Sequence, residues 1–180
     1  TGETVNLVIL DGREAFYLDK VESPQSLRIF SRIGRRAPLH CTAAGKVLLA
    51  ARSWPEVQRM LGRDSLERFT PRTILFPEAL RRELEAVRTE GVALDREECE
   101  EGATCIAAPV RNARGETVAA MSISGPTLRM HPERIRELTP VVVRMGHEAS
   151  KRLGCVVESA AVSQGSPEGR PDGQHRPGAC

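Results

Sequence analysis

A thiol and two hydroxyls in the second half of the chain are spaced so that they gather on one side of a strand pair. Residues 104–124 read as two strands joined by the loop "NARGE". If Arg111 pairs with Glu116 across that loop, Cys105 lies opposite Ser122, and directly opposed residues share a face of the sheet. Alternation along both strands then places small residues together on this face, namely Cys105, Ala107, Ala120, Ser122 and Ser124.

This small-residue face is typical of a small-molecule pocket. Small side chains leave room beside the sheet, while hydroxyl and thiol groups offer the few hydrogen bonds that orient a compact ligand. The bulkier residues Ile106, Val110 and Ile123 fall on the opposite face. The alternative is that helices pack closely against the small face and need small partners there. The sequence leaves both interpretations open.

The stretch "PLHCTAAGKVLLA", residues 38–50, resembles a phosphate-binding loop but lacks its chemistry. His40 stands where that loop requires its first glycine, and Val47 follows the lysine where a Ser or Thr would reach magnesium. The stretch instead predicts the start of a helix with Thr42 as its N-cap. Lys46 is expected on the solvated surface of this helix.

The first turn of this helix is a candidate anion site. Amide groups at a helix N-terminus have no partner within the helix, and the tiny side chains of Ala43, Ala44 and Gly45 let a carboxylate approach them. The alternative is an ordinary capped helix whose small residues serve packing. Asp95, in "VALDREECEEG", is a further candidate because a carboxylate accepts a hydrogen bond from a ligand hydroxyl. The alternative interpretation is that Asp95 belongs to a solvated, acidic edge strand.

Catalytic and metal chemistry are poorly supported. A cysteine nucleophile at Cys105 would need a base such as His40 or His147, and neither lies in a recognisable catalytic motif. The G-x-S-x-G elbow is absent, because Met121 stands at its first glycine. The histidines lack the spacing of a zinc site, so no metal or cofactor is expected. A redox switch through Cys105 is disfavoured, because no resolving cysteine is evident.

The elements around these residues predict an α+β domain. The opening "TVNLVILDGREAFYLDKVES" reads as a hairpin around Asp11-Gly12. Helices are expected from Thr42, from the capping box of Ser53 and Glu56, and after Pro77 until Gly91. Strands follow over 92–125, and a last helix after Pro132, with His131 as its N-cap, carries an apolar stripe. The order favours an antiparallel sheet with helices packed on it.

Composition describes an ordinary soluble chain. Among 180 residues, 40% are hydrophobic, 28% are charged and 3% are aromatic, with a net charge of +2, so a surface for nucleic acid is poorly supplied. No apolar run reaches the length of a membrane span, and a cytoplasmic protein is expected. Five cysteines without paired spacing fit reduced thiols in that compartment. A disordered tail is predicted over residues 157–180, which are rich in Gly and Pro.

The chain resembles the effector-binding domain of the IclR family of bacterial transcriptional regulators. The resemblance rests on "RAPLHCTAAGKVLLA", "LDREECEEGATCIAAPVRNARGETVAAMSISGP" and "RIRELTPVVVRMGHEASKRLG", in family order. It implies a GAF-like domain over residues 1–156 that binds a small organic or aromatic acid as effector and forms a homodimer or homotetramer. It also implies that operator DNA is bound only through an N-terminal winged helix-turn-helix domain that is absent from this chain.

The resemblance further implies which residues contact the effector. The family's ligand positions match Ala43 and Ala44 at the helix start, Asp95, and the hairpin residues Cys105, Ser122 and Ser124. The implied function is a non-enzymatic sensor. A small cysteine-dependent enzyme with Cys105 as nucleophile stays the alternative.

Overall fold

The protein is described by a computed structural model that covers residues 1–62 and 66–156. The tail predicted over 157–180 lies outside the described residues. In chain order the elements are β1 (Thr4–Asp11), β2 (Glu14–Val21), β3 (Arg36–Ala37), α1 (Ala43–Ala50), α2 (Trp54–Leu61), α3 (Pro77–Glu90), β4 (Ala93–Arg96), β5 (Ala103–Arg111), β6 (Thr117–Pro126) and α4 (Pro132–Arg152).

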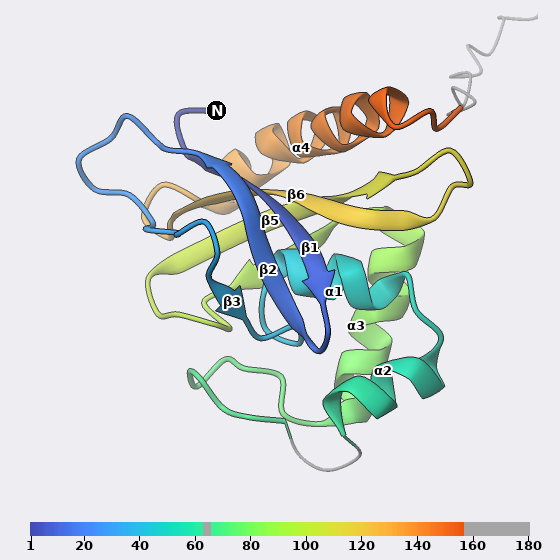
Figure 1. The fold of residues 1–180 in the computed structure, drawn as a ribbon. Helices are drawn as coiled ribbons and strands as arrows, with labels where there is room; N and C mark the ends of the chain where they lie inside the picture. Colours follow the sequence, from blue (N-terminus) through green and yellow to red (C-terminus); the bar gives the residue numbers. More distant parts are fainter. Residues whose placement is uncertain (63–65, 157–180) are drawn as a thin grey trace, which may run out of the picture.

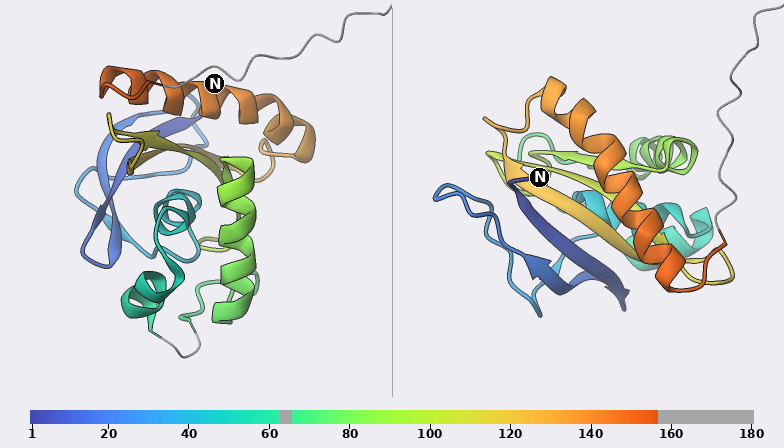
Figure 2. Two further views of the ribbon diagram at one scale, coloured as in Figure 1. Left: turned by 90° about the vertical axis from the view of Figure 1, so that its right-hand side faces the viewer. Right: turned by 90° about the horizontal axis from the view of Figure 1, so that it is seen from above.

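One antiparallel sheet separates two layers of helices. Its strand order is β3-β2-β1-β6-β5-β4. Helix α4 lies along one face, and α1, α2 and α3 lie on the other (Figures 1 and 2). Each layer has its own apolar cluster. The cluster on the side of α1, α2 and α3 is centred on Leu49, Leu80 and Leu84, and the cluster beneath α4 is centred on Ile106, Ile123 and Val142. The predicted α+β class, an antiparallel sheet with helices packed on it, is confirmed.

The β5–β6 hairpin keeps the predicted faces but not the predicted register. Cys105 pairs with Ser124 and Ala107 with Ser122, so the pairing of Cys105 with Ser122 is wrong. Asn112 closes the loop, because its amide donates to the Glu116 carbonyl at 2.9 Å. The register then shifts once more between Val110 and Arg111. Compared with the predicted pairing, Arg111 lies opposite Thr117 instead of Glu116, a difference of one residue, and the shift after Val110 adds a second. A total shift of two residues leaves every side chain on its predicted face.

The predicted helix ends agree with the structure. Thr42 Oγ1 accepts a hydrogen bond from the Gly45 amide at 3.1 Å, and Glu56 accepts from the Ser53 amide at 2.9 Å. Gly91 follows α3 with a φ of +71°, the left-handed conformation that glycine adopts without strain. His131 Nδ1 accepts from the Arg134 amide. None of the helices among the described residues is long and apolar enough to cross a lipid bilayer.

Helix α4 approaches strand β5 closely at a glycine. A Cβ atom on Gly146 would lie 2.6 Å from the Pro109 carbonyl oxygen. One turn later, the Ser150 hydroxyl donates to the Gly146 carbonyl at 2.6 Å and accepts from the Arg111 amide at 2.8 Å. The serine thus satisfies the last amide of β5 from across the layer, and the missing side chain at Gly146 makes this approach possible.

We expect Gly146→Ala to lower the free energy of unfolding by about 1–3 kcal/mol, because the added methyl group must push the helix away from backbone atoms that cannot yield. Urea denaturation measures the change. Arg144→Ala, at an exposed position of the same helix, is the matched control and should stay within about 0.5 kcal/mol of the wild type. Equal stability of the two variants would contradict close packing at Gly146.

Candidate ligand-binding site

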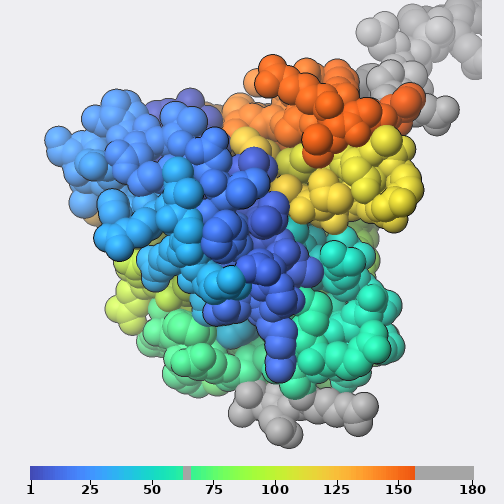
Figure 3. Space-filling view, in the orientation of Figure 1, coloured from blue at the N-terminus to red at the C-terminus, as the bar shows by residue number. Residues whose placement is uncertain are grey.

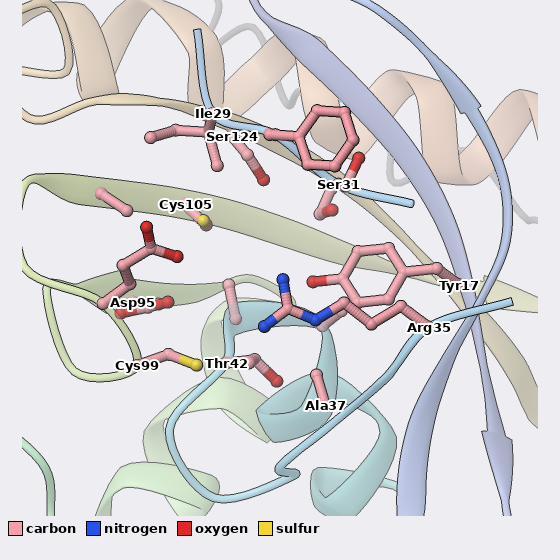
Figure 4. A pocket seen from close by; sticks show the side chains of 16 residues that line it. Tyr17, Ile29, Ser31, Arg35, Ala37, Thr42, Asp95, Cys99, Cys105 and Ser124 are labelled. Atoms are coloured by element: carbon pink, nitrogen blue, oxygen red, sulfur yellow. The ribbon is translucent and has the colours of Figure 1, made fainter. Parts of the chain in front are cut away.

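A small cavity lies between the sheet and the N-terminus of α1. Its volume is about 60 Å³. Its walls come from the α1 start, the small face of β5 and β6, the loop after β4, and the segment between β2 and β3 (Figure 4). All the predicted site residues line this one cavity, namely Ala43, Ala44, Asp95, Cys105, Ser122 and Ser124. That they bind a ligand stays a prediction.

The α1 N-terminus presents two amides to the cavity. Thr42 donates its hydroxyl to the Pro38 carbonyl at 2.8 Å and accepts from Gly45, so the Gly45 amide, which the sequence left as a candidate, is already engaged. The amides of Ala43 and Ala44 donate to no group among the described residues. Both alanines line the cavity, and their side chains are single methyl groups. The feature that the sequence predicted is present, reduced from three amides to two.

Asp95 is buried rather than solvated, so the interpretation of a solvated acidic edge is wrong for this residue. β4 is indeed an edge strand, but the Asp95 side chain is only 2% exposed, faces Cys105 across the β4–β5 pair and accepts from the Glu98 amide at 2.8 Å. Burial raises the pKa of Asp95 to about 7; hydrogen bonds from backbone amides and the Lys46 charge oppose the rise, and the Glu98 charge adds to it.

Lys46 is completely buried, contrary to the expectation of a solvated lysine. Its ammonium lies 2.9 Å from Glu83 Oε1 on α3 and 2.8 Å and 3.0 Å from the two carboxylate oxygens of Glu98. The Glu98 backbone carbonyl also accepts from the hydroxyls of Thr70 and Thr73. These bonds hold the loop after β4 against α1, and therefore set the position of the cavity wall that includes Asp95.

A buried amide organises the two serines. Asn6 Nδ2, on β1, donates to Ser122 Oγ and to Ser124 Oγ, both at 3.3 Å, and Asn6 Oδ1 accepts from the Ser31 hydroxyl at 2.6 Å. Each serine oxygen thus accepts from Asn6 and keeps its own O–H to donate. The sequence analysis missed Asn6. Its signal was a polar residue at a position where the alternation of "TVNLVIL" places an inward-facing side chain.

Strand β2, which carries Tyr17, and the segment between β2 and β3, which carries Arg35, supply the wall that the sequence did not predict. Figure 4 shows the Tyr17 hydroxyl and the Arg35 guanidinium pointing into the cavity opposite Asp95 and Cys99. Burial is the main cause that raises the pKa of Tyr17, so its phenol stays protonated and can donate. This segment projects over the body of the protein (Figure 3). The sequence between β2 and β3 has no hydrophobic period, so only the folded chain shows that Arg35 points into the cavity.

The thiol of Cys105 is a poor nucleophile. Burial, with the Asp95 charge as the next cause, raises the pKa of Cys105 although the side chain still borders the cavity. His40 is directed elsewhere, because its Nε2 lies 2.9 Å from the Glu67 carbonyl oxygen and burial lowers its pKa. His147 lies on α4, across the sheet (Figure 1). Neither histidine reaches the thiol as a base. Among the described residues, no group of His, Cys, Asp and Glu side chains is arranged to hold a metal ion.

The layered sheet and its cavity define the class of an α+β domain built around a compact internal pocket. Comparison with known proteins gives the family. The chain belongs to the IclR family of bacterial transcriptional regulators, since residues 1–151 match the family described as "Bacterial transcriptional regulator IclR C-terminal".

Curated relatives and solved structures agree with this membership. The chain is 44% identical to the HTH-type transcriptional regulator KdgR of Escherichia coli over 154 residues, 86% of this chain and 59% of that protein. The crystal structure of the KdgR C-terminal domain superposes with a TM-score of 0.76 at 42% identity, covering 86% of this chain and 89% of that one. The inducer-binding domain of the transcription factor PobR from Acinetobacter, in complex with 3-hydroxybenzoic acid, gives a TM-score of 0.74 at 31% identity, covering 87% and 90%.

These relatives are transcriptional regulators, which supports the predicted regulator over the cysteine-dependent enzyme. The chain spans between 54% and 61% of the length of three curated relatives that it matches.

The raised pKa of Asp95 predicts that the free energy of unfolding depends on pH. Because burial raises this pKa from about 4 in the unfolded chain to about 7 in the folded protein, folding takes up a proton between these values. The contribution of the neutral Asp95 carboxyl to the free energy of unfolding is therefore fully present below pH 4, and it is lost as the pH rises from 4 to 7. Asp95→Asn keeps an oxygen that accepts from Glu98 but cannot ionise.

We therefore expect the stability of Asp95→Asn relative to wild type to increase between pH 4 and 7, by at most about 1.4 kcal/mol per pH unit. Urea denaturation of both proteins over this range measures the difference, in which the other ionisations cancel. A difference that stays constant with pH would show that Asp95 is already ionised at low pH.

Proposed function

We propose that this chain, over residues 1–156, is the sensor domain of a transcriptional regulator, and that it binds a small carboxylic acid in the cavity at the α1 N-terminus. The observation that carries the proposal is the convergence on one small cavity of an arginine, two serine hydroxyls and two amides that have no partner among the described residues. The effector controls operator binding by a winged helix-turn-helix domain elsewhere in the full-length protein.

The anion end of the cavity is formed by α1 and Arg35. The positive end of the helix dipole and the amides of Ala43 and Ala44 favour a carboxylate. The guanidinium of Arg35 points toward the same cavity and can bind a carboxylate with two parallel hydrogen bonds (Figure 4). A neutral ligand would gain nothing from this charge, so the cavity selects acids.

The opposite end selects a second polar group on the ligand. Ser122 and Ser124 keep donors after accepting from Asn6, and Asp95 in its neutral form can also donate. The PobR domain was crystallised with 3-hydroxybenzoic acid, which carries a carboxylate and a hydroxyl. By analogy, the effector here is an acid with a hydroxyl or oxo group.

Switching requires that the acid bind one arrangement of the regulator better than another, since equal affinity would shift nothing. The cavity wall between β2 and β3 is the part of the site that is not backed by the helices, so its closure over the ligand is the step that couples binding to the rest of the molecule. The proposal places the regulator in the cytoplasm, where operator DNA is, as a homodimer or homotetramer. Whether it represses or activates is set by the DNA-binding part.

A panel of short hydroxy and oxo carboxylates, screened by thermal shift, tests the proposal, because a ligand that binds only the folded state raises the melting temperature. For the best acid, Arg35→Gln should weaken the affinity measured by calorimetry about 10- to 100-fold through loss of a charged hydrogen bond. Arg32→Gln, on the same segment but outside the cavity lining, is the matched control and should bind as wild type. If no acid stabilises the protein, or both variants bind alike, the proposed site is wrong.

Cys105→Ser separates the sensor from the cysteine-dependent enzyme. Because serine is close in size and also donates a hydrogen bond, the variant should keep its fold and bind the acid within about threefold of wild type, since a thiol is only a weak donor. Calorimetry with the acid identified above measures this. Turnover of any ester or amide substrate that the wild type shows and the variant loses would instead support the enzyme.

A further inference from the structure

Asn6 is a buried amide directly behind the cavity wall. The residue lies on β1 and is only 1% exposed. Its hydrogen-bond partners are three serines that line the cavity, namely Ser122 and Ser124 on β6 and Ser31 on the segment between β2 and β3. Asn6 does not line the cavity itself. It therefore acts on a ligand by setting how the serine hydroxyls are oriented.

The distances around Asn6 fix which end of its amide faces which serine. Ser31 Oγ lies 2.6 Å from Asn6 Oδ1, a separation that is typical of hydroxyl donors and too short for an amide N–H donor. The contacts to Ser122 Oγ and Ser124 Oγ are both 3.3 Å, which is nearer to the range of amide N–H donors than to the shorter range of hydroxyl donors. The carbonyl end of the amide therefore faces Ser31, and its NH2 end faces the β5–β6 hairpin.

This orientation leaves two hydroxyl protons at the hairpin wall of the cavity. Ser122 and Ser124 accept from the amide, and neither hydroxyl donates to another group in the described ranges 1–62 and 66–156. The two residues are 3% and 6% exposed, and both line the cavity. A buried donor without an acceptor costs free energy, and an acceptor on a bound ligand recovers it. The hairpin wall thus favours ligands that bring an acceptor.

We propose that Asn6 is a positioning residue that sets the specificity of this site: it makes the hairpin wall select an acid whose second polar group is an acceptor without a proton, such as an oxo group, over the matching hydroxy acid. An oxo oxygen has two lone pairs and can take the protons of both serines. A hydroxyl in the same place brings a further proton, and the Asn6 carbonyl cannot accept it because that carbonyl faces Ser31. The choice between the two acids rests on the proposed function, whereas the orientation of the amide does not.

Ser31 makes this selectivity depend on the wall between β2 and β3. A serine hydroxyl accepts as readily as it donates, so the bond from Ser31 to the carbonyl is what distinguishes the two ends of the amide. The segment that carries Ser31 is held on the sheet by two further bonds. The Lys20 ammonium donates to the Ser31 carbonyl at 2.7 Å, and Thr4 Oγ1 donates to the Ile29 carbonyl at 3.2 Å. Ser31 and Ser124 both face the cavity from opposite sides of Asn6 (Figure 4).

NMR of the folded chain tests the orientation of the amide without any ligand. The two protons on Asn6 Nδ2 should exchange slowly with solvent, because the side chain is buried. They should show stronger nuclear Overhauser effects to the β protons of Ser122 and Ser124 than to those of Ser31. Stronger effects to Ser31 would overturn the inference, because the carbonyl would then face the hairpin and accept the serine protons.

Calorimetric titration with pyruvate and with both enantiomers of lactate tests the selectivity. The wild type should bind pyruvate about 10-fold more tightly than lactate, which corresponds to roughly one hydrogen bond. In Asn6→Asp, a carboxylate of the same size accepts from both serines, so their lone pairs face the cavity instead of their protons. The preference for pyruvate should then vanish or reverse. The added negative charge weakens both acids alike, so the ratio of the two affinities is the quantity to compare.

Thr4→Val is the matched control. Thr4 lies two residues before Asn6 on the same face of β1 and is equally buried, but it bonds to Ser23 and Ile29 and to neither serine of the hairpin. This variant should keep the wild-type ratio of the two affinities. If Asn6→Asp does not fold, Ser31→Ala is the second variant, because it frees the carbonyl end of the amide and should lower the ratio in the same direction.

Two binding results would overturn the inference while leaving the proposed function intact: a wild type that binds lactate as tightly as pyruvate, or an Asn6→Asp protein that keeps the wild-type ratio. If neither acid binds, these acids count against the proposed function, and the NMR result alone decides whether Asn6 holds the serines as donors.

Discussion

The site depends on the buried ammonium of Lys46. A charge removed from water is tolerated only when carboxylates surround it, and removing one partner typically costs about 3–5 kcal/mol. Lys46 has Glu98 and Glu83 within hydrogen-bonding distance, so α1, α3 and the loop after β4 must meet at one point. Lys46 lies on the first turns of α1, close to the amides that face the cavity. The ion cluster therefore aligns the helix start with the end of β4, which carries Asp95, and with the loop that carries Cys99.

The same loop concentrates the titratable chemistry of the protein. Asp95, at the end of β4, accepts from the Glu98 amide, Glu98 binds Lys46, and Cys99 follows Glu98 in the chain and lines the cavity. Burial raises the pKa values of both Asp95 and Glu98, because the loop is covered by α1 and by the threonines at 70 and 73.

The β5–β6 hairpin gives the sheet two unlike faces, and this asymmetry creates the cavity. On one face Ile106 and Ile123 pack against α4, and the close approach at Gly146 leaves no space. On the other face alanines, serines and Cys105 are too short to fill the distance to α1. Asn6 completes this face by binding both serines, so the polar groups of the cavity hold fixed orientations before any ligand arrives.

The sequence by itself determined what depends on local chemistry and alternation: the helix caps at Thr42 and His131, the hairpins, and the gathering of Cys105, Ser122 and Ser124 on one face. Those predictions survived an error in register because side chains alternate with a period of two, and the error was two residues. Local chemistry also singled out Ala43, Ala44 and Asp95 as candidates, and the family motifs match the same positions.

Only the tertiary structure decided the burial of Lys46 and the entry of Tyr17 and Arg35 into the cavity. Each of these depends on which distant segments meet. A lysine on a helix is predicted to be solvated unless the folded structure shows that carboxylates from other elements surround it. Such contacts have no period along the sequence, because they are set by how the layers pack.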